Sequence, residues 1–203
     1  MPIDTEAALR GHYPAQSKIV ELKCLPAIDV HIARFISLSP FLVIGSSDPE
    51  NGTDVSPRGD APGFVRVVDA NTVMIPDRPG NNRLDTLSNI IANPEVGLVF
   101  FIPGVDETAR VNGRAKIVTG EAQLADFAVN GKPPRAAIVV DVREAYLHCA
   151  KALKRSKLWE EDYRIERGDL PTLGKMVSDQ VNGEISVEDA EAGVEISYRD
   201  RMW

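Results

Sequence analysis

The sequence has little cysteine and histidine. Its 203 residues include only two cysteines, Cys24 and Cys149, and three widely separated histidines. Metal sites of the zinc type need several such ligands close together, so we expect no metal site. A chain of this length buries about 70% of its unfolded surface and needs no disulfide to fold. Although Cys149 follows His148, we interpret it as a buried free thiol rather than a nucleophile, because adjacent residues on a helix point in different directions.

Long apolar runs and an excess of basic residues are also absent. The longest apolar runs are about half of what spans a bilayer, and the first ten residues carry acids where a signal peptide would carry bases. The 23 basic and 30 acidic side chains give a net charge of -7. This charge disfavours nucleic acid and anionic membranes as partners, although a local basic patch can still hold a phosphate. We expect a cytoplasmic protein.

The order of the expected elements indicates the fold class. There is no repeated alternation of strand and helix, no internal repeat and no long linker, so we expect one domain over 1–203. Residues 1–40 are expected to be a helical extension, with Asp29 capping its last helix, and 160–203 a polar extension made of loops. Strands dominate between them. This pattern predicts a mainly β fold with peripheral helices (α+β), an antiparallel barrel.

Several segments carry more detailed predictions. Residues 64–68 and 72–76 are expected to pair as a hairpin, and 107–120 to form a strand kinked at Asn112-Gly113. The continuous apolar run 96–104 is typical of a strand buried on both faces. Residues 135–147 predict a strand that runs into a helix over 145–159. In the helix expected after Arg83, one face is predicted to hold Leu84, Leu87, Ile90 and Ile91.

The segment DRPGNNR, residues 77–83, links a strand to a helix and is rich in donors. Unpaired N–H groups and the positive end of the helix dipole favour a phosphate at such a position, and arginine binds phosphate oxygens in pairs. The alternative is that Asn81 or Asn82 caps the helix and the arginines are solvated. The spacing alone does not separate the two.

The order DVSPRGDAPGF, FVRVV, TVMIPDRPGNNR and LDTLSNIIANPEVGLVFFIPG resembles that of the pyridoxamine 5'-phosphate oxidase-like flavoproteins, the FMN-binding split β-barrel family. The resemblance covers roughly residues 30–160 and implies a split barrel that binds FMN. It places three residues along the flavin ring, three in the following strand and three at the phosphate: Ser56, Pro57 and Arg58; Ile75, Pro76 and Asp77; and Arg78, Asn82 and Arg83. Arg78 has the alternative of pointing to solvent.

A second basic cluster lies on the expected helix 145–159, where His148, Lys151 and Arg155 share a face. In the family each FMN lies at a homodimer interface, so the resemblance makes Lys151 and Arg155 candidates to contact the flavin of the partner subunit, with Trp159 shielding a ring. The alternative is a solvated helix face.

The resemblance implies an FMN-dependent oxidoreductase that acts on a small organic substrate, with NADH or NADPH as a possible electron donor. No catalytic residue is assigned, because the flavin itself carries the electrons. The final residues YRDRMW lack the Arg-x-His pair of true pyridoxamine-phosphate oxidases, so we do not expect a vitamin B6 substrate. Two alternatives are a non-enzymatic flavin-binding or redox-sensing protein, and a relative that binds deazaflavin or haem, for which His148 is the one plausible axial ligand.

Overall fold

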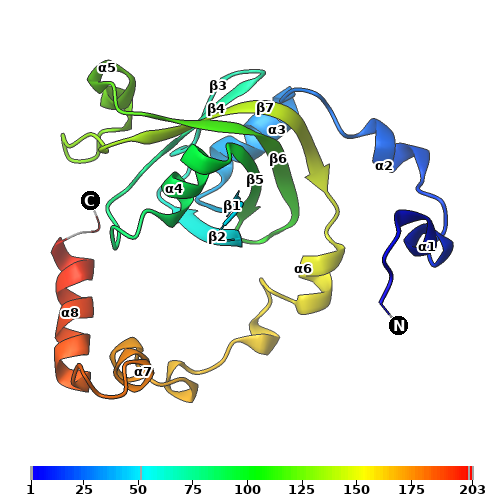
Figure 1. The fold of residues 1–203 in the computed structure, drawn as a ribbon. Coiled ribbons are helices and arrows are strands. Elements are labelled where there is room, and N and C mark those ends of the chain that lie inside the picture. Colours follow the sequence, from blue (N-terminus) through cyan, green and yellow to red (C-terminus); the bar gives the residue numbers. More distant parts are fainter. Residues whose placement is uncertain (1, 51, 201, 203) are drawn as a thin grey trace.

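In the computed structural model, which describes residues 2–50, 52–200 and 202, seven strands form the centre of the chain. They are β1 (Phe41–Asp48), β2 (Gly52–Gly59), β3 (Arg66–Asp69), β4 (Thr72–Pro76), β5 (Glu95–Ile102), β6 (Val105–Val118) and β7 (Ala137–His148). Their order in the sheet is β2-β1-β5-β6-β7-β4-β3, and all neighbours are antiparallel. The sheet curls on itself (Figure 1). The predicted antiparallel barrel is confirmed.

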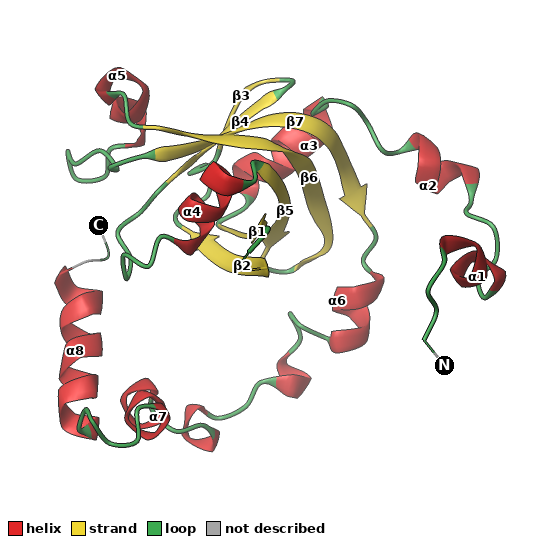
Figure 2. Ribbon diagram, viewed as in Figure 1, coloured by secondary structure: helices red, strands yellow, loops and turns green. Residues whose placement is uncertain are grey.

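Eight α-helices occur in the described part of the chain; α3 and α4 pack on the sheet, whereas α1, α2 and α7 stand apart from it (Figure 2). They are α1 (Glu6–Gly11), α2 (Lys18–Leu22), α3 (Val30–Leu38), α4 (Asp85–Ala92), α5 (Glu121–Leu124), α6 (Lys151–Ser156), α7 (Leu173–Gln180) and α8 (Val187–Asp200). The Asp29 carboxylate caps α3 as predicted, since it accepts hydrogen bonds from the backbone N–H groups of His31 and Ile32 at 3.0 and 2.8 Å. Within the described residues, no helix combines the length and apolarity that crossing a membrane would require.

Two local predictions about the strands are confirmed. Strands β3 and β4 form the expected hairpin, and the β6–β7 ladder shifts register between Asn112 and Gly113. Glycine is needed at this bulge, because a Cβ at Gly113 would lie 2.3 Å from the carbonyl oxygen of Asp141.

The chain buries only one face of β5, not both as predicted. Val96, Leu98 and Phe100 are buried, whereas Gly97 and Val99 are only half-buried. The reason is that α3 and α4 pack on the inner face alone, where their isoleucines join Leu98 and Phe100 in the core.

The predicted apolar face of α4 is confirmed only in part: Ile90 is buried and Leu87 packs against the core, but the other two members do not. Leu84 and Ile91 are 52% and 78% exposed, and the residues that face the barrel are Thr86, Asn89 and Ile90. Two of these residues form hydrogen bonds with the barrel. The Asn89 amide donates to Ser46 Oγ at 3.0 Å, and the Thr86 hydroxyl donates to Asp54 at 3.3 Å. Hydrogen bonds therefore set the rotation of this helix, which hydrophobic periodicity cannot reveal.

The helix predicted over 145–159 begins later. Strand β7 continues to His148, which pairs with Thr108 of β6, and α6 covers only Lys151–Ser156. The long ladder to β6 overrides the local helical preference. His148 consequently does not share a helix with Lys151 and Arg155, and Cys149, expected to be buried, is exposed.

The C-terminal extension contains two helices where loops were expected. Helices α7 and α8 pack on each other, and Gly174 permits the contact, since a Cβ there would lie 2.3 Å from Glu191 Cγ. The Thr172 hydroxyl caps α7 by accepting a hydrogen bond from the N–H of Lys175 at 3.2 Å. The acidic composition of this segment led to the prediction of loops. Neither helix needs a large apolar face to pack on the other, so the usual hydrophobic pattern of a helix is weak here.

Candidate functional site

A cleft of about 1170 Å³ opens between strand β2 and the turn that connects β4 to α4. Its walls are residues 54–59 of β2, the segment 76–87 and the loop 129–135, with Phe64 and Asp200 also lining it. The predicted residues in 56–58 and 76–83 all line this cleft. Ile75 instead is fully buried in the core.

Burial alternates along strand β2, although residues 54–59 all line the cleft. Asp54, Ser56 and Arg58 are half-buried, while Val55 and Pro57 between them are exposed. The strand pairs with β1 and stands at the edge of the sheet. A proline without an N–H is tolerated there, because no strand beyond β2 needs the donor.

An ion pair joins β2 to the turn after β4. The guanidinium of Arg58 lies 2.9 Å from the Asp77 carboxylate, and both side chains are about one fifth exposed. The Nε of Arg58 is buried and has no hydrogen-bond partner among the residues that the structure describes. A buried donor without a partner is unfavourable by about 1–3 kcal/mol, so this position favours a ligand that brings an acceptor.

Arg78 anchors the turn to the rest of the barrel. Its Nε lies 2.6 Å from the Asp60 carboxylate and another nitrogen donates to the carbonyl of Phe127 at 2.7 Å. The side chains of Arg78 and Asp60 are 17% and 4% exposed. Arg78 therefore does not point to solvent, the alternative left open by the sequence.

The rim of the cleft, residues 81–85, is exposed and strained. Asn82 and Leu84 have φ of 59° and 63°, in the left-handed region, where a leucine is uncommon. Leu84 stands at the N-cap of α4 and makes no side-chain cap hydrogen bond. Arg83 pairs with Asp85 at 2.8 Å, and the two side chains are 74% and 43% exposed. Uncapped N–H groups beside an exposed arginine are suited to an anion.

A sequence profile of the pyridoxamine 5'-phosphate oxidase family matches residues 28–149, more than half of the chain. The chain belongs to this family. The family binds flavins, and the barrel described above is its split-barrel fold. The chain matches no curated protein sequence.

The chain is also similar to solved structures at low identity. HupZ of Group A Streptococcus is 17% identical, with a TM-score of 0.46 over 59% of this chain and 93% of that chain. A protein related to general stress protein 26 from Clostridium acetobutylicum is 11% identical, with a TM-score of 0.44 over 60% and 90%. Protein Rv2991 from Mycobacterium tuberculosis is 12% identical, with a TM-score of 0.47 over 70% and 94%.

Two cations of the cleft were missed from the sequence of this family member. Lys132 and Arg135 lie in the loop NGKPPR, residues 130–135, and both line the cleft. No motif predicted from the sequence includes this loop. The available signal was an Asn-Gly turn followed by two prolines flanked by cations, which predicts a rigid loop that carries charge.

The two remaining predicted residues, Lys151 and Arg155, are exposed on α6 and do not line the cleft of their own chain. Helix α6 lies near the start of β6, with Lys154 at 3.5 Å from Asp106. The indole of Trp159 donates to the carbonyl of Val105 at 2.9 Å, which holds the segment after α6 against the same place. In Figure 1 this helix and the β4–α4 turn lie on different sides of the barrel.

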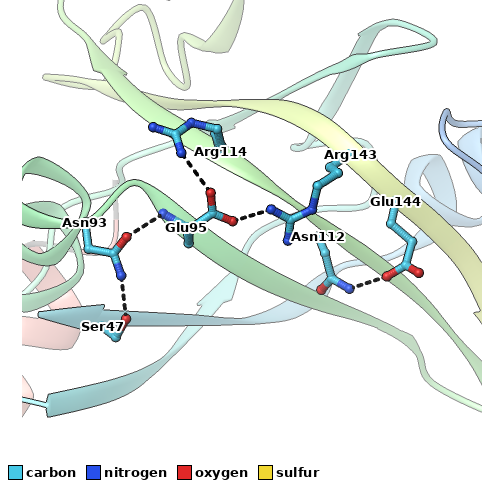
Figure 3. Close-up of polar contacts among 7 residues, drawn as sticks. All are labelled: Ser47, Asn93, Glu95, Asn112, Arg114, Arg143 and Glu144. Carbon is cyan, nitrogen blue, oxygen red and sulfur yellow. Dashed lines mark hydrogen bonds and ion pairs between the residues drawn. The ribbon is translucent and has the colours of Figure 1, made fainter. Parts of the chain in front are cut away.

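The outer face of β5, β6 and β7 carries a polar network (Figure 3). Glu95 accepts hydrogen bonds from Arg143 at 2.6 Å and Arg114 at 2.9 Å, and these arginines lower the pKa of Glu95. Asn112 donates to Glu144 at 2.8 Å. The network ties the three strands together across the surface.

Arg110 lies on the same sheet and differs from these arginines. Its guanidinium stands 5.4 Å from the ring centre of Tyr146, and its Nε is buried without a hydrogen-bond partner among the described residues. Nearby, burial and then the charges of Lys23 and Arg110 lower the pKa of His148. Of the side-chain nitrogen and oxygen atoms in the described residues, Arg110 Nε and Arg58 Nε are the two buried without a partner, one on the barrel surface and one at the cleft.

Proposed function

We propose that the protein is an FMN-dependent oxidoreductase that acts on a small organic substrate, with FMN bound in the cleft between β2 and the β4–α4 turn. The observation that carries the proposal is the buried, unpartnered Nε of Arg58 in a cleft whose rim presents the uncapped end of α4. A flavin ring has carbonyl and ring-nitrogen acceptors for the first feature, and its ribityl phosphate is an anion for the second.

The residues of the cleft fit FMN in the order that the resemblance implies. Asn82 and Arg83 at the rim would hold the phosphate, and Arg78 would keep the turn in place through Asp60. Ser56, Pro57 and Arg58 would lie along the ring. Pro76 and Asp77 would border it from the other side, with Ile75 supporting them from the core.

Bound flavin supplies the group that accepts and returns electrons, and the chain supplies position and electrostatics. Arg58 provides a fixed positive charge, only one fifth exposed, that would oppose negative charge on the reduced ring. Asp77 keeps that guanidinium oriented at 2.9 Å. No acid or base in the cleft needs to be invoked for the chain's part in the reaction.

We also propose that the working form is a homodimer in which Lys151 and Arg155 contact the FMN of the partner subunit. Both are exposed and lie outside their own cleft. Val55 and Ile91 are exposed by 63% and 78%, and Arg110 keeps a buried donor without a partner on the outer face. A twofold partner would cover such apolar surface and could satisfy that donor.

The test begins with the cofactor. Flavin released by heat from the purified protein should run as FMN on chromatography, and a cofactor that runs as FAD, deazaflavin or haem would reject the assignment. Anaerobic mixing with NADH and with NADPH then measures reduction of the bound flavin. A flavin that neither donor reduces would favour the non-enzymatic alternative.

Sedimentation equilibrium tests the assembly at micromolar concentration. We expect a dimer that weakens when FMN is removed, because a ligand shared by two chains stabilises their association by mass action. A 22 kDa monomer with fully bound flavin would reject the shared site. Lys151→Ala should weaken FMN binding, and Lys154→Ala, on the same helix, is its matched control and should not.

A further inference from the structure

Helices α7 and α8 form an arm that stands apart from the barrel. The Thr172 hydroxyl donates to Glu191 at 2.5 Å, and the Ser178 hydroxyl donates to the carbonyl of Ile185 at 2.8 Å. Of the elements that the structure describes, these two helices pack substantially only on each other. Helices of 8 and 14 residues are marginal in water unless tertiary contacts stabilise them. The arm is therefore a preformed unit that is suited to pack on a further surface.

One side of α8 is open to water. Half-buried residues recur on the side of Glu191, which lies against α7. Glu188, Ala192 and Glu195 are exposed, and their spacing of four and three residues places them on one face of the helix. Ile196 beside them is 44% exposed. We call these four exposed residues the open face of α8.

The arm is acidic, and one other segment has the opposite charge. Residues 173–200 hold seven acids and two cations, whereas residues 151–157, which include α6, hold four cations and no acid. The two carboxylates of the open face form no ion pair with any described residue, nor do Lys151 and Arg155. Within one chain, α6 and α8 lie at the two ends of the C-terminal segment (Figure 1). The two surfaces are complementary in charge, but a single chain does not bring them together.

The end of α8 lies at the cleft. Asp200, the last residue of this helix, lines the cleft together with the β4–α4 turn. In the homodimer proposed above, Lys151 and Arg155 of the partner subunit reach the same cleft. The cleft is then the place where α8 of one chain meets α6 of the other.

We propose that α8 of each chain packs its open face on α6 of the partner subunit, with Glu188 and Glu195 beside the cations of that helix. Ile196 gains apolar contacts there in place of water. Each chain gives one arm and receives one, as a twofold axis requires. The proposal rests on the homodimer of the proposed function and adds a second role for α6, which binds both the arm and the flavin of the partner subunit.

Charge reversal across the two chains tests the contact. Sedimentation equilibrium, without flavin and with FMN, gives the dissociation constant of the dimer. Glu188→Lys/Glu195→Lys should weaken the flavin-free dimer about tenfold, because two cations then face the cations of α6. Lys151→Glu/Arg155→Glu should weaken it by a similar factor. The variant with all four substitutions should regain the affinity of the parent protein, and a failure of this rescue would overturn the proposal.

The control variant is Glu50→Lys/Glu121→Lys, which changes the net charge equally. Both residues are exposed and lie outside α6, the arm and the lining of the cleft. It should keep the dimer affinity of the parent protein. An equal loss in this variant would show that total charge alone governs association, and the contact between α8 and α6 would be rejected.

Hydrogen exchange separates the partner subunit from other surfaces that the arm could cover. The amides of α8 should exchange slowly in the dimer and faster once dilution yields monomers. Protection that persists in the monomer would place the arm on its own barrel and overturn the proposal. So would fast exchange at every concentration.

The same measurements distinguish this proposal from the proposed function. A parent protein that binds no FMN would reject the proposed function, while the charge reversals in the flavin-free dimer would still decide the contact. A parent protein that binds FMN and stays monomeric would reject the contact and leave the FMN site standing. Dimers that the Glu188→Lys/Glu195→Lys variant forms as tightly as the parent protein would also reject the contact alone.

Discussion

Arg78 and Arg83 lie five residues apart in the same turn, and both pair with an aspartate at hydrogen-bond distance, 2.6 and 2.8 Å. Their surroundings differ. The pair of Arg78 with Asp60 is 17% and 4% exposed, whereas that of Arg83 with Asp85 is 74% and 43% exposed. We call the first the anchor and the second the rim pair.

The difference shows how burial divides the roles of two similar ion pairs. An exposed pair contributes about 0–1 kcal/mol, so Arg83 can exchange Asp85 for a phosphate at little loss. Separating a buried pair leaves an uncompensated charge and is unfavourable by about 3–5 kcal/mol. Arg78 is thus a structural residue of the turn, and Arg83 is the one that we propose binds the phosphate.

The largest expected effect is on stability at the anchor. Arg78→Ala should lower the free energy of unfolding by about 3 kcal/mol, because it leaves the Asp60 carboxylate buried without its cation. Urea denaturation measures the change. Arg83→Ala is the control and should stay within about 0.5 kcal/mol of the parent protein. Similar losses for both variants would remove the distinction between anchor and rim pair.

The next expected effect is on FMN affinity rather than on stability, and it is at Arg83, in the rim pair, rather than at the anchor. Arg83→Ala should weaken FMN binding on the order of ten- to a hundredfold, through the loss of a charge-assisted contact of about 1.5–3 kcal/mol. Fluorescence titration gives the affinity. The matched control is Arg66→Ala, since Arg66 pairs with Asp126 at 2.7 Å and does not line the cleft. An equal loss at Arg66 would refute the role of Arg83.

A smaller effect tests the strain of the rim. Leu84→Asn should raise the free energy of unfolding by about 1 kcal/mol, because asparagine tolerates the left-handed backbone that leucine adopts here at φ 63°. Leu84 is 52% exposed, so little burial is lost. Leu84→Ala, measured by the same thermal or urea unfolding, should bring no gain. A less stable Leu84→Asn protein would contradict the prediction that the left-handed backbone at this position destabilises the parent protein.

The smallest effect lies away from the turn, at His148. Burial and nearby cations lower the pKa of this histidine, so the unfolded chain takes up a proton at a higher pH than the folded one. Its contribution therefore reduces stability as the pH falls from about 6.5, the ordinary value, toward the lower folded pKa. His148→Gln should flatten the loss of stability between pH 7.5 and 5.5, and His12→Gln, on the N-terminal segment, should not. The anchor should be unaffected by either variant.

The course of the backbone at the site was largely predictable. Strand β4 and the hairpin β3–β4 agree with the apolar runs 64–68 and 72–76, and the cap at Asp29 agrees with α3. The donor-rich segment 77–83 is the strand-to-helix turn that the sequence predicts, and the structure adds that it lines a cleft. Each of these features depends on residues that lie within about ten positions of one another in the sequence.

The sequence could not show which charges neutralise one another. Asp60 and Arg78 are 18 residues apart, and Lys132 and Arg135 reach the cleft from a loop some fifty residues beyond the turn. The polar contacts of Asn89 with Ser46 and of Thr86 with Asp54 likewise turned α4 away from its apolar pattern. Contacts of this kind are long-range, and no spacing rule encodes them.

By itself, then, the sequence determined three things: the antiparallel fold class, the resemblance to a flavin-binding barrel and the position of the basic turn. It could do so because alternation, turn residues and caps act locally. The tertiary structure decided that Arg78 is buried against Asp60, that Arg83 remains exposed, and that Lys132 and Arg135 line the cleft without an ion pair to any described residue. The physical reason is that burial is a property of the folded sheet. Whether an arginine stabilises the fold or is available to a ligand depends on how exposed it is and which carboxylates lie near it. Only the folded chain sets both.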